Sequence, residues 1–309
     1  MPTRRRLQEL VVQNDGRGFR TTRQTGRGGA RRSSRRAARR RLRKGLSVVA
    51  AHRKRGRRLV HTSWDPVADW YSGWVGEAGS NHHRLLALPA VLDLLEPIAG
   101  EQILDIGAGP GVLAPLIAAA GAHYTGVDAS RKLIEFARMH HARHGRFLYG
   151  DAARLDDLPE LRGGSFDAAV FLLSIQDMDP LDAVLRSAAW ALRAGGRVVL
   201  LMTHPCFRVP RQSGWGWDAG RRLRYRRVDR YLTALAVPMK AYGRQHGATR
   251  SFHRPLEAYI NGLAACGLLV DCVRELPTYQ AQPAGPHAGA ENLANQEIPL
   301  FLGLRARKL

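Results

Sequence analysis

Three glycines at alternate positions follow a short apolar run and an aspartate in the segment ILDIGAGPGVL, residues 103–113. The aspartate is Asp105, and the glycines are Gly107, Gly109 and Gly111. Because glycine carries no side chain, a turn built from it lets the backbone pass directly against a bound molecule. The motif therefore predicts a ligand site at the end of a strand, with a carboxylate beside it.

The spacing of the glycines separates the classes of ligand. Dinucleotide-binding folds have the pattern G-x-G-x-x-G, in which the last glycine lets the helix pack close to the strand. Val112 stands where that pattern needs glycine. A phosphate-binding P-loop is excluded as well, because no Gly-Lys-Ser or Gly-Lys-Thr follows. Asp128 ends the next predicted strand, but an acid at that place occurs in dinucleotide folds too and does not discriminate alone.

The elements that must position these residues alternate between strand and helix from residue 84 onward. Apolar runs predict buried strands at residues 101–107, 123–129, 146–151, 166–174 and 197–203. Ser130 and Asp179 predict the N-caps of two of the intervening helices, and Gly145 and Gly195 their ends. Such alternation predicts a parallel sheet with helices on both faces. Ligands bind these sheets at the carboxyl ends of the strands, where the glycine motif lies.

The glycine motif resembles motif I of the class I S-adenosylmethionine-dependent methyltransferases, and residues 84–203 keep step with that family. The resemblance implies an α/β fold: a Rossmann-like seven-stranded mixed sheet, its last strand antiparallel, with helices on both faces. Residues 254–309 fit the family's last helix and antiparallel hairpin. The implied cofactor is S-adenosyl-L-methionine, and Asp105 would place negative charge near its ammonium group.

The resemblance also implies a set of cofactor contacts. Asp128 would accept hydrogen bonds from both ribose hydroxyls, and Asp151 would bind the adenine amino group. Tyr71, in the segment WDPVADWYSGW, matches the tyrosine of an N-terminal arm that folds over the cofactor in many small-molecule methyltransferases. In chain order the predicted contacts are Tyr71, Asp105, Gly107, Gly109, Gly111, Asp128, Ala129, Asp151, Ala152 and Leu173.

The methyl acceptor is less clearly marked than the cofactor. Enzymes that methylate amino groups usually carry an Asn/Asp-Pro-Pro-Tyr-type motif after the fourth strand, where this chain reads LLSIQDMDP. His204, at the end of the fifth strand, is the candidate catalytic base toward a hydroxyl or an acidic carbon, and a structural histidine is the alternative. Cys206 is a candidate nucleophile for pyrimidine methylation, with a small buried thiol as the alternative.

Residues 204–253 are predicted to form an insertion that caps the substrate. The segment combines ten arginines, among them Arg208, Arg211, Arg221, Arg222, Arg224, Arg226 and Arg227, with Trp215, Trp217 and Tyr225. A lid over an anionic or aromatic substrate, a nucleic-acid surface and a solvated loop all fit this composition.

The basic charge of the chain is concentrated at its start. The formal net charge is +22, but residues 1–60 hold 21 of the 48 Lys and Arg residues and two of the 26 Asp and Glu residues, so residues 61–309 carry only +3. Residues 1–60 are predicted to be a disordered low-complexity segment. A phosphate-binding arm, a transit peptide and an upstream stretch translated in the wrong frame remain open as interpretations.

The predicted domains are therefore residues 1–60, a basic segment, and residues 61–309, a methyltransferase domain. The chain contains no run of 18 apolar residues, so no membrane span is predicted. Its three cysteines lack C-x-x-C spacing, which favours a reducing, cytoplasmic setting and no metal site. The predicted function is methyl transfer from S-adenosylmethionine to a small molecule. The alternative is an RNA-directed methyltransferase or nucleic-acid binder that uses the basic arm, and the oligomeric state is left open.

Overall fold

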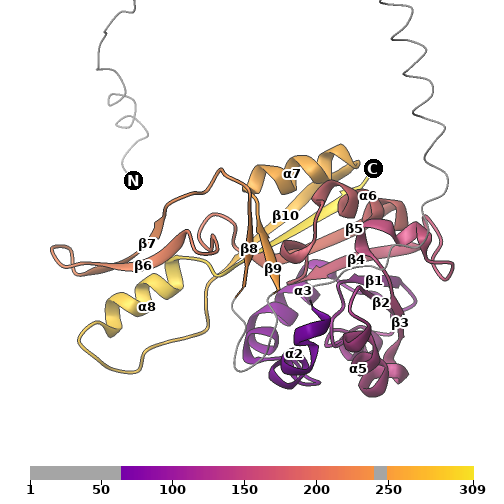
Figure 1. The fold of residues 1–309 in the computed structure, drawn as a ribbon, viewed down its shortest axis with the longest axis horizontal. Coiled ribbons are helices and arrows are strands. Elements are labelled where there is room, and N and C mark those ends of the chain that lie inside the picture. Colours follow the sequence, from indigo (N-terminus) through magenta and orange to yellow (C-terminus); the bar gives the residue numbers. More distant parts are fainter. Residues whose placement is uncertain (1–63, 240–248) are drawn as a thin grey trace, which may run out of the picture. The chain divides into compact units, whose positions relative to one another are not determined.

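A seven-stranded sheet forms the centre of the fold. The computed structural model describes residues 64–239 and 249–309, and the strands of this sheet lie in the order β10-β11-β5-β4-β1-β2-β3 (Figure 1). Strands β1 to β5 pair in parallel, whereas β11 is antiparallel to both β5 and β10. The predicted mixed sheet with an antiparallel last strand is confirmed. The strands are β1 (Gln102–Ile106), β2 (His123–Asp128), β3 (Arg146–Tyr149), β4 (Phe166–Leu172), β5 (Leu192–Thr203), β10 (Leu268–Leu276) and β11 (Phe301–Lys308).

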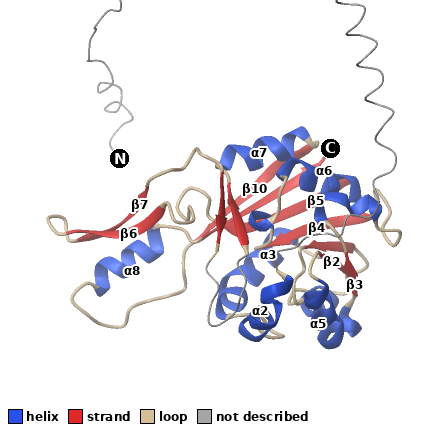
Figure 2. Ribbon diagram, in the orientation of Figure 1, coloured by secondary structure: helices blue, strands red, loops and turns tan. Residues whose placement is uncertain are grey.

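Helices cover both faces of the sheet (Figure 2). One face packs against α6 (Leu181–Ala191) and α7 (Leu256–Ala265). The other packs against α3 (Leu88–Leu95), α4 (Ala114–Ala119) and α5 (Arg131–His141). Successive residues of a strand point to opposite faces, so Ile103 and Leu104 belong to different hydrophobic clusters. This two-sided burial explains why the central strand β4, FDAAVFL, is apolar at nearly every position.

The helix boundaries follow the predicted signals in one place and depart from them in another. Ser130 caps α5, where its hydroxyl accepts a hydrogen bond from the Leu133 amide. Asp179, by contrast, is not the N-cap of α6, which is Pro180. The Asp179 carboxylate instead accepts a hydrogen bond from Arg254, 2.8 Å away, just before α7. A charged partner from a distant segment has replaced the local capping contact.

The segment between β5 and α7 contains two small sheets. One is the hairpin of β6 (Ser213–Asp218) and β7 (Leu223–Val228), and the other pairs β8 (Leu235–Pro238) with β9 (Arg250–His253). A further helix, α8 (Ala288–Glu297), lies between β10 and β11 and packs against β7 (Figure 1). The first described elements are a short turn, η1 (Asp65–Val67), and α2 (Ala68–Val75). These segments lie outside the central sheet.

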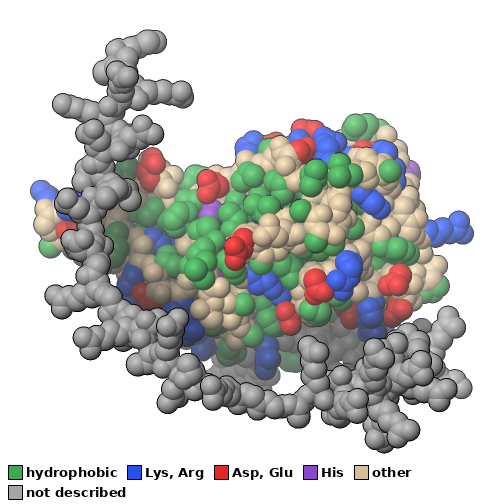
Figure 3. Space-filling view, turned by 90° about the horizontal axis from the view of Figure 1, so that it is seen from above, with side chains coloured by type: hydrophobic (Ala, Val, Ile, Leu, Met, Phe, Trp, Pro, Cys, Tyr) green, Lys and Arg blue, Asp and Glu red, His purple; other side chains and the backbone are tan. Residues whose placement is uncertain are grey.

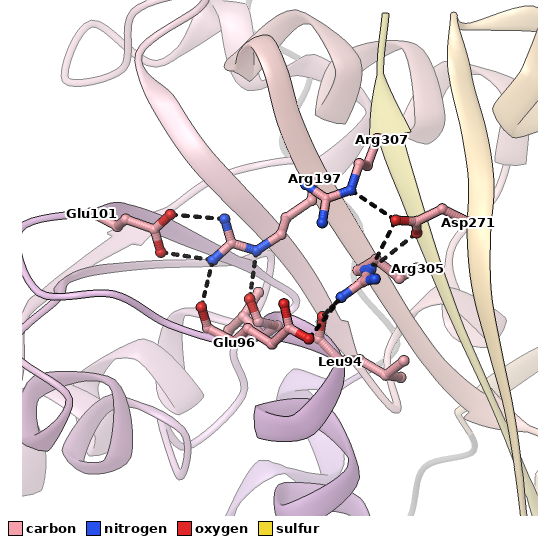
Figure 4. A network of polar contacts seen from close by, with 8 residues as sticks. Leu94, Glu96, Glu101, Arg197, Asp271, Arg305 and Arg307 are labelled. Atoms are coloured by element: carbon pink, nitrogen blue, oxygen red, sulfur yellow. Dashed lines mark hydrogen bonds and ion pairs between the residues drawn. The ribbon is translucent and has the colours of Figure 1, made fainter.

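An ion-pair network lies at the end of the sheet opposite the glycine motif (Figure 4). The Arg197 guanidinium donates two hydrogen bonds to the Glu101 carboxylate, at 2.8 and 2.6 Å, and others to the Leu95 and Glu96 carbonyls at the end of α3. Both side chains of the ion pair are about nine-tenths buried. The network therefore joins the end of α3, the start of β1 and the middle of β5.

No helix among the described residues is long and apolar enough to cross a membrane. On the face of the molecule drawn in Figure 3, side chains of Lys and Arg are interspersed with those of Asp and Glu. The coloured surface in that view, which belongs to the described residues, shows no continuous patch of one charge. The predicted basic segment, residues 1–60, lies outside the described residues.

Candidate active site

The glycine loop connects β1 to α4 and lies against the end of β2. The Gly107 and Ala108 amides donate hydrogen bonds to the Val127 carbonyl at 2.8 and 3.1 Å. Gly107, Gly109 and Gly111 have φ angles of 77°, 54° and 82°, the left-handed region that side chains disfavour. The backbone conformation therefore favours glycine at all three positions of the motif.

The three glycines differ in what surrounds them. A Cβ atom on Gly107 would lie 2.6 Å from the Ser174 Cβ, and one on Gly111 would lie 2.8 Å from the Phe147 ring. On Gly109 the nearest atom would be in the Tyr71 ring, 3.9 Å away. Gly107 and Gly111 thus face packed protein, whereas Gly109 faces open space beneath Tyr71.

Substitutions at two of these glycines are expected to separate stability from binding. Gly107→Ala combines a left-handed φ with a steric clash, so we expect about 2–4 kcal/mol lower stability in urea unfolding. Gly109→Ala introduces no steric clash. We expect its positive φ to lower the stability by about 1–2 kcal/mol, and we expect a marked loss of cofactor affinity. Equal destabilisation by both substitutions would contradict this assignment of the open side.

Asp128 holds the glycine loop and the start of α5 together. Its carboxylate oxygens accept hydrogen bonds from the Gly109 amide, 2.8 Å away, and from the Ser130 amide, 2.7 Å away. Burial raises the pKa of Asp128 to about 6, against the effect of these two amides. Each oxygen retains a second lone pair, so the half-buried carboxylate can still accept hydroxyl donors.

Asp105 lies beneath the loop rather than on its surface. The side chain is buried, and its Oδ2 accepts a 2.7 Å hydrogen bond from the Tyr124 hydroxyl. Among the described residues, Oδ1 has no hydrogen-bond partner. Burial raises the pKa of this carboxyl to about 7. Its unpartnered oxygen is the feature of this carboxyl that suits a cationic group.

The remaining predicted contacts follow β2, β3 and β4. Asp151 comes after β3, where its carboxylate accepts a 2.9 Å hydrogen bond from the Ala153 amide and leaves the side chain about one-third exposed. Ala152 packs against the core cluster that contains α6, and Ala129 follows Asp128 as a half-buried residue. Leu173, directly after β4, has a φ of 54° and is half-buried. All four residues lie at the carboxyl ends of parallel strands.

His204 has a different setting from the one expected of a catalytic base. Its ring is buried, with 2% of its surface exposed. Nδ1 accepts a hydrogen bond from the Cys206 amide, and Nε2 lies 2.9 Å from a Glu275 carboxylate oxygen. The pairing leaves no ring nitrogen for a substrate, which fits the structural alternative. The Cys206 thiol, for its part, lies 3.5 Å from the Tyr231 hydroxyl, outside the cavity described next.

A cavity of about 710 Å³ shares one residue, Tyr71, with the predicted cofactor contacts. Trp64, just before η1, and the aromatic side chains of α2 form one part of its lining, the aromatic wall, and residues after β4 or from the end of β5 onward form most of the rest. Tyr71 belongs both to this wall and to the open side of Gly109. The lining residues are Trp64, Val67, Trp70, Tyr71, Trp74, Gln176, Asp177, Thr203, Arg208, Val209, Pro210, Arg211, Ser213, Arg226, Met239, Thr249 and Ser251.

Asp177 is the one carboxylate among the described residues that line the cavity. It ends a short turn, η5 (Ile175–Asp177), directly after β4. Burial raises its pKa to about 7, and a hydrogen bond from Ser251 opposes this shift. Sequence reasoning missed Asp177 as a functional residue. An acid close behind the end of a buried parallel strand is the signal that marks it.

Comparison with known proteins agrees with this geometry. A family model described as a methyltransferase domain matches residues 104–200. The ubiquinone biosynthesis O-methyltransferase of Aromatoleum aromaticum is 33% identical over 151 residues, which is 48% of this chain and 60% of that protein. That of Xylella fastidiosa is 27% identical over 152 residues, 48% of this chain and 62% of that protein.

Solved structures extend the likeness beyond the matched domain. An S-adenosylmethionine-dependent methyltransferase from Mesorhizobium loti superposes with a TM-score of 0.56 at 29% identity, covering 71% of this chain and 96% of its own. The chain contains a class I S-adenosylmethionine-dependent methyltransferase domain. A putative methyltransferase from Listeria monocytogenes shares the fold at a TM-score of 0.55 and 19% identity, over 72% of this chain and 98% of its own. The chain spans about 60% of the length of the curated relatives it matches.

The residues of the methyltransferase domain fit S-adenosylmethionine. The open side of Gly109 leaves space for it, Asp128 offers oxygen lone pairs to hydroxyls, and Asp105 has an unpartnered buried oxygen. A sulfonium nucleoside with an ammonium group and ribose hydroxyls needs this set of acceptors and no phosphate cradle.

Asp128→Ala is expected to weaken the binding of S-adenosylhomocysteine by about 2–3 kcal/mol, a factor of roughly 30 to 150. The substitution removes two acceptor oxygens and releases the Gly109 amide. Because the pKa of Asp128 is raised to about 6, affinity for the wild type is expected to fall below that pH as the carboxyl becomes protonated. Calorimetry measures both effects. Asp93→Ala, a surface substitution on α3, is the control, and an unchanged affinity of Asp128→Ala would exclude the assignment.

Proposed function

We propose that this protein transfers a methyl group from S-adenosylmethionine to a small-molecule acceptor held in the 710 Å³ cavity. The observation that carries the proposal is the position of Tyr71, which joins the open side of Gly109 to the cavity wall. A donor at the glycine loop and an acceptor in the cavity would thus lie next to each other. The volume falls in the range of pockets for small molecules, about 300–1,000 Å³.

The acceptor is proposed to present a hydroxyl oxygen. The curated relatives named above are O-methyltransferases, and the lining of the cavity combines aromatic side chains with polar and charged ones. Trp70 and Trp74 stack with their rings parallel at 6.1 Å, and Trp64 contacts Tyr71 edge to face at 4.8 Å. A wall of this kind suits a flat, largely apolar acceptor.

Asp177 is proposed to accept the proton of that hydroxyl. Bound S-adenosylmethionine supplies a methyl group on a sulfonium, which is already a good leaving group. The protein therefore needs mainly to align the acceptor oxygen, exclude water and take one proton. As the oxygen–methyl bond forms and the sulfur–methyl bond breaks, the hydroxyl proton passes to the Asp177 carboxylate. A carboxyl with a pKa of about 7 suits that task near neutral pH.

The first test is titration of S-adenosylmethionine into the full chain by calorimetry, with NADH as the control. We expect binding of the former alone, because Val112 breaks the dinucleotide pattern. Binding of NADH, or of neither compound by the folded protein, would overturn the proposal. Transfer of a radiolabelled methyl group to a panel of phenols and catechols would then identify the acceptor.

Three predictions that accompany this function also stand as proposals. Residues 61–309 act as one methyltransferase domain, within which residues 204–253 cap the acceptor. The setting is reducing and cytoplasmic, which is supported by three cysteines that remain unpaired. The partner is a small molecule rather than a nucleic acid, since residues 61–309 carry a net charge of only +3.

A further inference from the structure

The charged side chains that line the acceptor cavity come from two different parts of the chain. The lining includes three arginines, Arg208, Arg211 and Arg226, but within the described part of the chain only one carboxylate, that of Asp177. Asp177 follows β4, whereas the arginines belong to the insertion after β5. A molecule that fills the cavity would therefore meet a proton acceptor from the sheet and positive charge from the insertion.

Two of these arginines belong to a cluster around one indole ring. The guanidinium carbons of Arg208 and Arg226 each lie 5.2 Å from the centre of the Trp215 ring, and that of Arg224 lies 4.5 Å away. Trp215 and Arg226 are direct partners across the β6–β7 hairpin. Three positive charges thus gather on one side of the hairpin, where they repel one another.

Within the described part of the chain, an acid pairs with only one of the three arginines. Arg224 pairs with Glu291 of α8 at 3.4 Å. Arg226 donates to the Phe207 carbonyl and the Ser213 hydroxyl, and Arg208 donates to two carbonyls at the long distances of 3.3 and 3.4 Å. Among the described residues, no carboxylate lies within ion-pair distance of Arg208 or Arg226.

Half-buried guanidinium groups without a counterion are costly. Burial, together with the neighbouring charges of Arg226 and Arg224, lowers the pKa of Arg208 to about 10. Carbonyl dipoles satisfy individual N–H groups but do not neutralise the net charge. An oxyanion in the cavity would do so, because guanidinium groups match carboxylate and phosphate oxygens in geometry as well as charge.

We propose that the methyl acceptor carries an anionic group, a carboxylate or a phosphate ester, which Arg208 and Arg226 bind while the reacting hydroxyl faces Asp177. The proposal rests on the proposed methyltransferase function and adds the class of acceptor. The aromatic wall of the cavity would hold the apolar body of the molecule between these two ends.

The test compares three probes of similar shape: 2-naphthoate, the neutral 2-naphthamide and 2-naphthyl phosphate. Each is titrated by calorimetry into the full chain saturated with S-adenosylhomocysteine. We expect at least one anion to bind ten or more times tighter than the amide, and the tighter of the two distinguishes carboxylate from phosphate. Equal affinity for anions and amide, or no binding of either anion, overturns the proposal.

Charge-removing variants then locate the preference. Arg208→Gln and Arg226→Gln are each expected to lose at least tenfold in affinity for the anion and little for the amide. Arg227→Gln is the matched control, since it removes the same charge one residue along β7, where the side chain is exposed and pairs with Asp229. An equal loss of anion affinity in Arg227→Gln would mean that only the net charge of the protein matters. That result would overturn the proposed binding of the anion by Arg208 and Arg226.

Failure of this proposal can be told apart from failure of the proposed function. If S-adenosylhomocysteine binds but the anions show no preference, only the acceptor class is wrong. If S-adenosylhomocysteine does not bind, the methyltransferase proposal fails first. Should the arginine variants not fold, the comparison of 2-naphthoate with 2-naphthamide on the wild type still decides the question.

Discussion

Asp177→Asn is expected to lower kcat/KM for methyl transfer by about 10²- to 10⁴-fold, the usual contribution of a positioned proton acceptor. The substitution keeps the size of the side chain and removes its basic oxygen. In the wild type the pKa of Asp177 is raised to about 7 by burial. The carboxylate must be ionised to accept a proton, so kcat/KM is expected to rise with pH through about 7 and then level off.

Two further variants distinguish proton transfer from a structural effect. Ser251→Ala removes the hydrogen bond that favours the ionised form of Asp177, so the rise of kcat/KM should move to higher pH. Asp182→Asn alters an exposed carboxylate on α6 and should leave both rate and profile unchanged. If Asp177→Asn keeps the wild-type profile, the proton leaves by another route and the role is wrong.

Arg197→Met is expected to lower the free energy of unfolding by about 3–5 kcal/mol, measured by urea denaturation, with the Glu101 carboxylate left buried and unpaired. The carbonyls of Leu95 and Glu96 lose their donor at the same time. Replacing Glu101 by leucine in the same chain should recover much of the loss, because a buried ion pair can be exchanged for apolar contact at little cost. Arg186→Ala, which breaks an exposed pair on α6, should change stability by less than about 1 kcal/mol.

The same pair gives stability a pH dependence with a defined sign. Hydrogen bonds from Arg197 lower the pKa of Glu101 below its ordinary value of 4.5. The stabilisation is therefore complete above pH 4.5 and is lost as the pH falls through the lowered pKa of the folded state. In Arg197→Met, this part of the acid sensitivity should disappear. An unchanged loss of stability in acid would show that other carboxyls control it.

Much of the fold is predictable from sequence because a strand that is buried on both faces has a continuous run of apolar residues. Strand β4 and residues 198–202 of β5 are nearly all apolar, and the Ser130 cap of α5 is a local signal. Helix α8 was missed, since half of its sequence AGAENLANQE is polar and it packs on β7 rather than on the central sheet. The expected N-cap at Asp179 was wrong because Arg254, 75 residues away in the chain, binds that carboxylate instead.

Some residues of the candidate site could be placed from the sequence, and others could not. The glycine loop, Asp128 and Asp151 follow strands in a fixed order, so sequence spacing places them. The burial of His204 and its pairing with Glu275 depend on β10, which no local pattern connects to β5. The proximity of Arg208 to Arg226 likewise depends on how the insertion folds. The arginine-rich composition of the insertion was compatible with a lid, a nucleic-acid surface and a solvated loop.

The two halves of the candidate site come from different segments of the chain. The donor half consists of loops that follow β1, β2 and β3, whereas most of the acceptor cavity comes from η1, α2 and the insertion between β5 and α7. Replacing residues 204–253 with the corresponding insertion of a relative would leave the donor loops in their own sequence. The architecture thus lends itself to chimeric enzymes, in which one methyl-donor platform is paired with interchangeable acceptor modules.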